Sequence, residues 1–227
     1  MKKLYGLIFD VDGVIADTEA VNARASIRVF EDLFSVKGVK RQDFEAGLGR
    51  GAAEYVKAAA GIHGLELTEE QIEKATKLRQ DYFLKILSEE PLPPFPGVLE
   101  LIEDALQREE FRLAIATSST PEKSRTVLES AKIPFQEMVY ITGNDVKNKK
   151  PEPELFLLAA ERMGIEPANC VVIEDAPNGV QAAKAAGAKC IAVTNSTDAA
   201  KLCEADVVCD SLEQIDIQTI VKLLKTE

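Results

Sequence analysis

Two aspartates separated by one residue follow a short apolar run near the start of the chain. The run Leu4–Phe9 is followed by Asp10, Val11, Asp12 and Gly13. Side chains two positions apart in an extended segment point the same way, so the two carboxylates face together. Such a pair can divide labour, because one acid attacks as a nucleophile while the other exchanges a proton with the leaving group and with water. The alternative is a strand that ends in an ordinary Asp-Gly turn.

A second acidic pair, Glu174 and Asp175, follows the apolar run Val171–Ile173. Adjacent carboxylates at a buried strand end repel each other unless a cation lies between them. A small number of oxygen ligands suits Mg²⁺, which keeps several waters and bridges to phosphate. The pattern therefore predicts a magnesium site, and the alternative is an aspartate that caps the following helix.

Hydroxyl groups and a lysine follow two further apolar runs. Thr117, Ser118 and Ser119 come after Leu113–Ala116, and Lys150 precedes a proline later in the chain. A cation and hydroxyl donors are what a phosphate site needs. A polar turn and a solvated lysine are the alternatives when each is considered alone.

The elements that must position these residues read as strands that alternate with helices from Phe111 onward. This alternation predicts a doubly wound, Rossmann-like α/β core with a parallel sheet covered on both faces. In such sheets ligands bind at the carboxyl ends of the strands, where all the polar residues above are found. The predicted strands are Leu4–Phe9, Leu113–Ala116, Met138–Ile141, Cys170–Ile173, Cys190–Val193 and Asp206–Cys209.

The region from residue 18 to residue 90 contains no convincing strand. Thr68 to Gln71 form a capping box, and apolar residues then recur near helical spacing. Four prolines between Pro91 and Pro96 form a stiff connector. We expect residues 1–17 and 92–227 to form the catalytic core and residues 18–91 to form an inserted, all-helical cap domain.

Composition limits the partners. The formal net charge is −11 with a pI near 4.8, so the surface as a whole repels nucleic acid and anionic membranes. A small anionic substrate remains possible, because a cation cluster or metal can reverse the field inside a pocket. The cysteines lack zinc-site spacing and are expected to be free thiols in a reducing compartment. We expect a monomer in the cytoplasm, or in an organelle stroma if a transit peptide was removed.

The four motifs together resemble the haloacid dehalogenase superfamily. FDVDGV at residues 9–14, a threonine after the second core strand, a lysine before proline and a strand ending in ED occur in that order. The run from Val172 to Val180, followed by an alanine-rich stretch and Gly187, is similar to the β-phosphoglucomutase-like phosphatase branch. The helical insertion after the first motif is similar too.

This resemblance implies a role for each matching residue. Asp10 would form an aspartyl-phosphate, and Asp12 would be the general acid/base and bind the metal through its carbonyl oxygen. Thr117 and Lys150 would hold the phosphoryl oxygens. Mg²⁺ would be bound by Asp10, Asp12 and Asp175, with Glu174 acting directly or through water. The expected substrate-binding residues are Gly13, Thr18, Asn22, Arg50, Ser118 and Ser119.

The chain also departs from the pattern of this branch. Asn22 and Ala46 stand where mutases carry a histidine and a lysine, and Ala176 replaces a common serine or threonine. Arg50 lies among glycines, so it is predicted to contact substrate, the alternative being an arginine in a surface loop. The favoured function is a Mg²⁺-dependent phosphatase acting on a small phosphorylated metabolite, a sugar phosphate or phospho-acid. The alternatives are a sugar-phosphate mutase and a non-catalytic regulatory domain.

Overall fold

The computed structural model describes residues 3–47 and 51–225 of the chain. These residues form two compact units. The first unit comprises residues 1–17 and 92–227, and the second comprises residues 18–91. The two units are described separately below.

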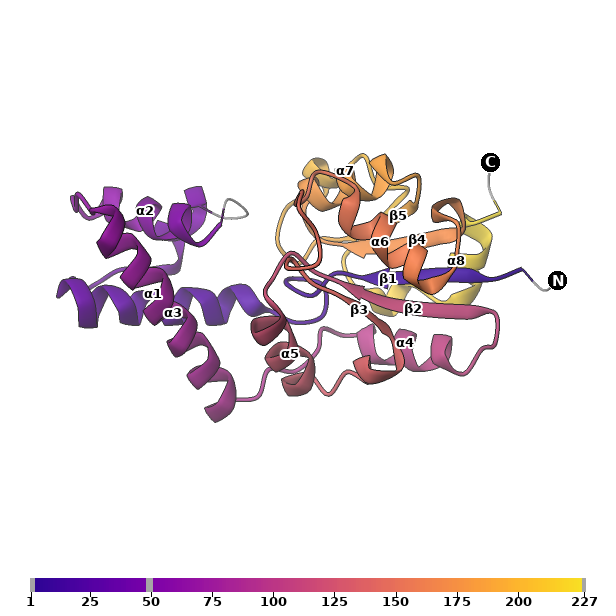
Figure 1. Ribbon diagram of the computed structural model, residues 1–227, viewed down its shortest axis with the longest axis horizontal. Helices are drawn as coiled ribbons and strands as arrows, with labels where there is room; N and C mark the ends of the chain where they lie inside the picture. Colours follow the sequence, from indigo (N-terminus) through magenta and orange to yellow (C-terminus); the bar gives the residue numbers. More distant parts are fainter. Residues whose placement is uncertain (1–2, 48–50, 226–227) are drawn as a thin grey trace. The chain divides into compact units, whose positions relative to one another are not determined.

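A six-stranded, fully parallel sheet is the centre of the first unit (Figure 1). The strand order is β3-β2-β1-β4-β5-β6, so the chain starts in the middle and winds outward in both directions. The three strands at the centre, β1, β2 and β4, are almost entirely buried, as expected for a sheet covered on both faces. The strands are β1 (Tyr5–Phe9), β2 (Phe111–Ala116), β3 (Val139–Ile141), β4 (Cys170–Glu174), β5 (Lys189–Val193) and β6 (Val207–Cys209).

Helices cover both faces of this sheet (Figure 1). Because parallel crossovers are right-handed, the helices that connect strands in one direction across the sheet lie on one face, and those that connect strands in the opposite direction lie on the other. The helices α4 (Val98–Leu106) and α5 (Pro121–Ser130) lie on one face, and α6 (Glu154–Met163) and α7 (Pro177–Ala185) lie on the other. The last helix, α8 (Ile217–Leu223), contacts α4. Short 3-10 helices occur at η2 (Phe135–Glu137), η3 (Pro167–Asn169), η4 (Ala199–Leu202) and η5 (Leu212–Gln214).

The predicted fold class is confirmed, and the predicted strands all exist with ends shifted by one or two residues. For example, β2 begins at Phe111 rather than Leu113, and β4 extends through Glu174. Local residues account for two helix ends. Thr120 caps α5 with Pro121 in its first turn, and Gly187 adopts a positive φ just after α7 ends.

The second unit consists of helices around a core of its own. Phe30, Phe44 and Tyr55 pack together there, with the Phe44 and Tyr55 rings stacked 4.7 Å apart. The predicted capping box is present, because the Thr68 side chain accepts from the Gln71 amide and Gln71 reaches back to Thr68. The elements are α1 (Thr18–Phe34), η1 (Arg41–Gly47), α2 (Ala52–Ile62) and α3 (Glu69–Glu89).

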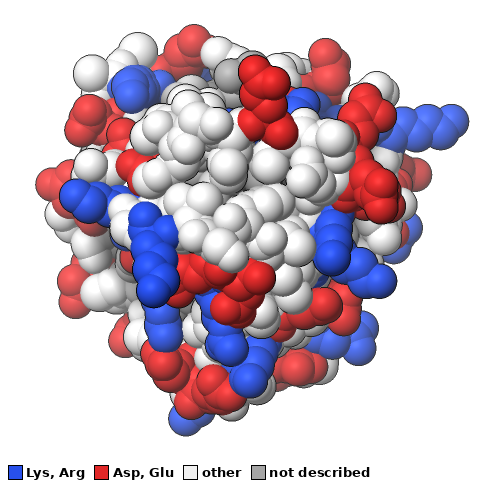
Figure 2. Space-filling view, turned by 90° about the vertical axis from the view of Figure 1, so that its left-hand side faces the viewer, with Lys and Arg blue, Asp and Glu red and all other residues white. Residues whose placement is uncertain are grey.

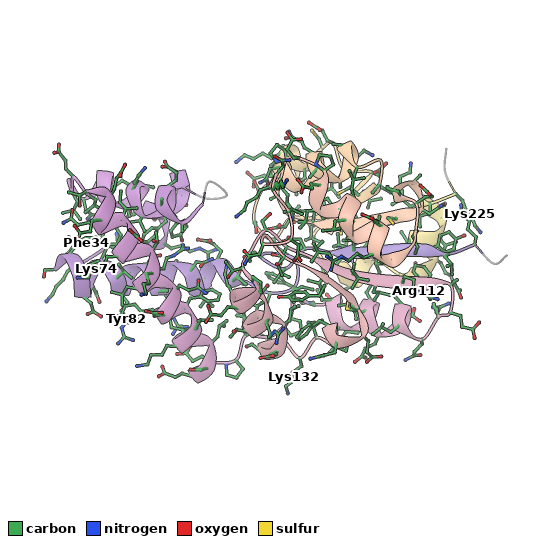
Figure 3. All side chains as sticks on the ribbon, in the orientation of Figure 1. Phe34, Lys74, Tyr82, Arg112, Lys132 and Lys225 are labelled. Carbon is green, nitrogen blue, oxygen red and sulfur yellow. The ribbon has the colours of Figure 1, made fainter. Side chains whose placement is uncertain are left out.

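Polar contacts on the surface join the helices of this second unit. Tyr82 of α3, labelled in Figure 3, donates to Asp32 of α1 at 2.7 Å, and the Arg28 guanidinium lies 4.5 Å from its ring centre. His63, the single histidine of the chain, has a partner within the helical unit, because its Nε2 lies 2.8 Å from Oδ2 of Asp43.

Two surface observations bear on the expected partners. On the face shown in Figure 2, acidic and basic side chains are interspersed around an area of uncharged residues. Among the described residues of that face, no continuous basic surface appears of the kind that nucleic acid requires. Within residues 3–47 and 51–225, no helix has both the length and the apolar character needed to cross a membrane.

Candidate active site

The carboxyl ends of the central strands bring the predicted catalytic residues together. Phe9 at the end of β1 pairs with Ile115 of β2 on one side and with Ile173 of β4 on the other. The residues that follow these positions therefore lie side by side at one edge of the sheet. They are Asp10, Asp12, Thr117, Glu174 and Asp175.

Lys150 connects two of these strand ends. Its Nζ donates to Oδ1 of Asp10 and to Oε1 of Glu174, both at 2.6 Å. The lysine side chain is only 7% exposed, and its Nζ lies 4.9 Å from the ring centre of Phe156 in α6. Burial lowers the pKa of Lys150, but Asp10 and Glu174 outweigh that effect and raise it above its ordinary value. This lysine therefore stays a cation inside the site.

Glu174 is held from two sides. Its Oε2 accepts hydrogen bonds from the backbone amides of Asp175 and Ala176, at 2.8 and 3.0 Å, while Oε1 accepts from Lys150. Gly179 of α7 passes so close that a Cβ added there would overlap the Glu174 carboxylate. Each oxygen therefore already accepts at least one hydrogen bond, which fixes the orientation of this carboxylate.

Asp175 reaches the turn that carries the first aspartate pair. Gly13 makes this approach possible, since a Cβ there would overlap Oδ2 of Asp175. Gly13 also has a positive φ of 79°, which favours glycine. Two residues that follow β5, Asn195 and Ser196, also contact this turn, and neither was predicted from the sequence. The Ser196 side chain hydrogen bonds to Asp175, and Nδ2 of Asn195 donates to the Gly13 carbonyl oxygen at 2.8 Å.

Three buried carboxylates share one buried lysine here. The pKa of Asp10 is raised to about 7. Burial is the largest cause, Lys150 opposes it, and the charges of Glu174 and Asp12 raise the pKa further. Burial, together with Glu174 and Asp10, also raises the pKa of Asp175 well above its ordinary value. The negative charge at this edge of the sheet is therefore only partly balanced by the protein.

Asp12 has a different environment, which contains a residue that sequence reasoning missed. Lys123 in the first turn of α5 donates from Nζ to Oδ1 of Asp12 at 2.7 Å. The Ser119 hydroxyl donates to the other oxygen, Oδ2, at 2.5 Å. No local sequence signal pointed to Lys123, because it lies 111 positions from Asp12 along the chain.

The hydroxyl segment after β2 lies at the same edge. Thr117 is buried, and its Oγ1 accepts from the Ser119 amide at 3.1 Å. Ser118 is half-buried, and Gly143 approaches its carbonyl oxygen so closely that a side chain at Gly143 would overlap it. The three hydroxyl residues thus follow the end of β2, next to the end of β1 that carries Asp10 and Asp12.

Two predicted substrate-binding residues belong to the helical unit, and a third is not among the described residues. Thr18 and Asn22 belong to α1 of the helical unit, where Thr18 is buried and Asn22 is half-buried. Arg50 lies outside the described residues. The substrate contacts of all three stay predictions.

The residues of the first unit suit a divalent cation. Within the described parts of the chain, no group of three His, Cys, Asp or Glu side chains is arranged to hold a metal by itself. Magnesium, however, needs only one or two carboxylates and takes its other ligands from water and phosphate. Asp10 and Asp175 are buried carboxylates whose raised pKa values a dication between them would lower again. The donor set therefore fits Mg²⁺.

A family comparison agrees with this geometry. The family model of the haloacid dehalogenase-like hydrolases matches residues 6–187. This range includes the ends of β1, β2, β3 and β4. The chain belongs to the haloacid dehalogenase-like hydrolase family. The resemblance inferred from the four motifs is thereby confirmed.

Curated relatives extend the comparison. Hexitol phosphatase A of Escherichia coli is 30% identical, with 93% of each chain covered. Phosphorylated carbohydrates phosphatase of Thermotoga maritima is 33% identical, with 89% of this chain and 91% of the relative covered. Protein SUPPRESSOR OF QUENCHING 1, chloroplastic, of Arabidopsis thaliana is 32% identical over 96% of this chain, which spans only 21% of that relative's length. Relatives named phosphatases confirm, at the level of the family, the predicted phosphoric monoester hydrolase.

Solved structures share the whole fold. CbbY from Rhodobacter sphaeroides, solved with phosphate, has a TM-score of 0.81 at 26% identity and covers 96% of this chain and 99% of its own. β-Phosphoglucomutase from Clostridium difficile has a TM-score of 0.78 at 24% identity, with 97% of each chain covered, and shows likeness of fold alone.

Proposed function

We propose that this haloacid dehalogenase-like hydrolase is a phosphatase that acts on a small phosphorylated metabolite, a sugar phosphate or phospho-acid. The single observation that carries the proposal is the position of Asp10. Its carboxylate lies 2.6 Å from a buried lysine, beside a second aspartate that is hydrogen-bonded on both oxygens. The relatives named as phosphatases of hexitols and phosphorylated carbohydrates support the substrate class.

In the proposed first step a carboxylate oxygen of Asp10 attacks the phosphorus atom. The bond between phosphorus and the leaving oxygen breaks, and that oxygen takes a proton from the carboxyl group of Asp12. Lys150 and the hydroxyl of Thr117 hold the phosphoryl oxygens. The lysine is needed because an anionic nucleophile approaches an anionic phosphate, and a fixed cation offsets that repulsion.

In the second step water attacks the phosphorus atom of the aspartyl-phosphate. Its proton passes to Asp12, the bond between Asp10 and phosphorus breaks, and inorganic phosphate leaves. Asp10 and Asp12 thereby return to their starting states. The covalent route divides one difficult displacement into two easier ones.

We propose Mg²⁺ as the cofactor, held by Asp10, Asp175 and the carbonyl oxygen of Asp12, with Glu174 in support through water. When bound, the ion supplies charge neutralisation between the carboxylates and the phosphoryl oxygens. Ser196 would hold Asp175 in the orientation needed to ligate it.

In this proposal the helical unit, residues 18–91, is the cap that selects the substrate, with Thr18, Asn22 and Arg50 among the contacts. The two mutase-specific cations are replaced by Asn22 and Ala46, which favours hydrolysis over transfer within the substrate. The four cysteines are free thiols, which supports a reducing compartment, the cytoplasm or an organelle stroma. The monomeric state also stays a prediction.

Asp10→Asn tests the covalent mechanism. The variant should fold normally and lose turnover by several orders of magnitude, on the scale of other nucleophile removals. Rapid quench of the parent with ³²P-labelled substrate should trap label on Asp10, and EDTA should abolish the activity. Near-normal turnover in Asp10→Asn, measured by phosphate release from a panel of metabolites, would refute the assignment.

The same product analysis separates the two candidate enzymes. A phosphatase releases inorganic phosphate and free sugar, whereas a mutase interconverts hexose 1- and 6-phosphates. Isomerisation faster than phosphate release would replace the phosphatase by the mutase.

A further inference from the structure

Both carboxylate oxygens of Asp12 are engaged by one short segment of the chain. Oδ1 accepts from Lys123 and Oδ2 accepts from Ser119, at 2.7 and 2.5 Å. Lys123 is well covered, with its side chain 15% exposed, and the Asp12 side chain is 32% exposed. Two donors on opposite oxygens fix the direction of a carboxylate far better than one donor does.

This pair of donors is itself anchored. Ser119 directly precedes Thr120, whose hydroxyl caps α5, and Lys123 lies in the first turn of that helix. Ser124 donates to the Thr120 carbonyl oxygen or pairs with the Tyr140 hydroxyl, at 2.8 and 2.6 Å, and Tyr140 also reaches the Pro121 carbonyl oxygen. The start of α5 is thus tied to β3.

The two lysines of the site have separate partners. Lys150 donates to Asp10 and Glu174, and Lys123 donates to Asp12. All these contacts join residues of the first unit. In the proposed mechanism Lys150 therefore holds the phosphoryl group, and a different lysine, Lys123, contacts Asp12.

We propose that Lys123 is the positioning residue of the general acid/base, holding the Asp12 carboxylate together with Ser119 in line with the leaving oxygen and the attacking water. The inference rests on the proposed phosphatase function and adds to it a residue outside the four family motifs. Lys123 acts through Asp12 and needs no contact with the substrate.

This role has a kinetic signature that depends on the leaving group. The alkoxide that leaves a hexose phosphate is strongly basic and needs the proton from Asp12. The 4-nitrophenolate ion is weakly basic and leaves without one. The attack of water on the aspartyl-phosphate needs Asp12 with either substrate.

Lys123→Met tests the role with two substrates, 4-nitrophenyl phosphate and the hexose phosphate that the parent hydrolyses fastest. For the hexose phosphate we expect kcat/KM to fall about 10²-fold, the loss that misplacement of a catalytic group by about 1 Å causes. For 4-nitrophenyl phosphate kcat/KM should fall only a few-fold. Its kcat should fall more, with a burst of 4-nitrophenol equal to the enzyme concentration, because the second step becomes limiting.

Two further variants separate positioning from other roles. Lys123→Arg keeps a cation of similar reach and should recover part of the lost hexose phosphate activity. The double variant Asp12→Asn, Lys123→Met should be no slower than Asp12→Asn alone, because Lys123 has no effect without Asp12. Lys184→Met is the matched control. It removes an ion pair of the same 2.7 Å length, to Asp206 before β6, and should leave both activities unchanged.

Three results would overturn the inference. They are equal losses of kcat/KM for both substrates, additive losses in the double variant, or no loss in Lys123→Met. Circular dichroism and thermal unfolding establish that each variant is folded, and if Lys123→Met is not, Lys123→Gln and Lys123→Arg decide by the same comparison. An inactive parent, or an active Asp10→Asn, would refute the proposed function instead.

Discussion

Gly179 and Gly61 are both helical glycines, but an added methyl group meets different surroundings at the two positions. Alanine is favoured over glycine inside a helix by about 1 kcal/mol. At Gly61, in the last turn of α2, nothing lies within 4 Å of the position of an added Cβ. We therefore expect Gly61→Ala to raise the free energy of unfolding by up to about 1 kcal/mol.

Gly179→Ala should have the opposite sign. The added Cβ would overlap the carboxylate of Glu174, which cannot move without losing hydrogen bonds to the amides of Asp175 and Ala176 or to Lys150. Each hydrogen bond to a charged group contributes about 1.5–3 kcal/mol. Losing one or two of them, against a helix gain of about 1 kcal/mol, leaves a net destabilisation of about 0.5–5 kcal/mol.

Urea unfolding followed by far-UV circular dichroism measures both effects, and unchanged m-values would show that stability alone has changed. Gly179→Ala should also lower phosphate release, because Lys150 loses the geometry that Glu174 provides. If Gly179→Ala is as stable and as active as the parent, the packing of α7 against Glu174 does not position the lysine.

Two more predictions follow from neighbouring contacts. Ser196→Ala removes the hydrogen bond to Asp175. The Mg²⁺ concentration needed for half-maximal activity should then rise roughly tenfold, because residues that hold a metal ligand in place affect metal affinity by about this much. An unchanged Mg²⁺ titration would contradict this role. Partial burial raises the pKa of Asp206, but hydrogen bonds from Lys184 and the Cys190 amide outweigh it and hold the pKa below 3.8. Asp206→Asn should therefore lower the unfolding free energy at neutral pH, and the difference from the parent should shrink as the pH falls through the lowered pKa. A difference that does not change with pH in urea titrations would mean that the charge of Asp206 is not what stabilises the native state.

Local sequence patterns were enough to predict the layers of the first unit and the ends of its strands to within two residues. Local patterns suffice for this, because a strand that is buried on both faces must be apolar throughout, and a helix must cap its own amides. The apolar runs that end at Phe9 and Ile173 therefore marked two strands, and the capping box at Thr68 marked the start of a helix. Once the strands are parallel, their carboxyl ends share one edge of the sheet, so the sequence predicts that Asp10 and Asp175 lie close together.

The partners of each charged group were decided only by the tertiary structure. Lys123 lies 111 positions from Asp12, and nothing local to either residue selects the other among the many lysines and acids of the chain. The same holds for His63 with Asp43 and for Ser196 with Asp175. Glu174 shows the limit most clearly. Its sequence pattern fits a metal ligand, but the approach of Lys150 and of the amides at the start of α7 occupies both its oxygens. Such contacts depend on strand order and on how closely a glycine such as Gly179 lets two elements approach, which the spacing of residues along the chain does not specify.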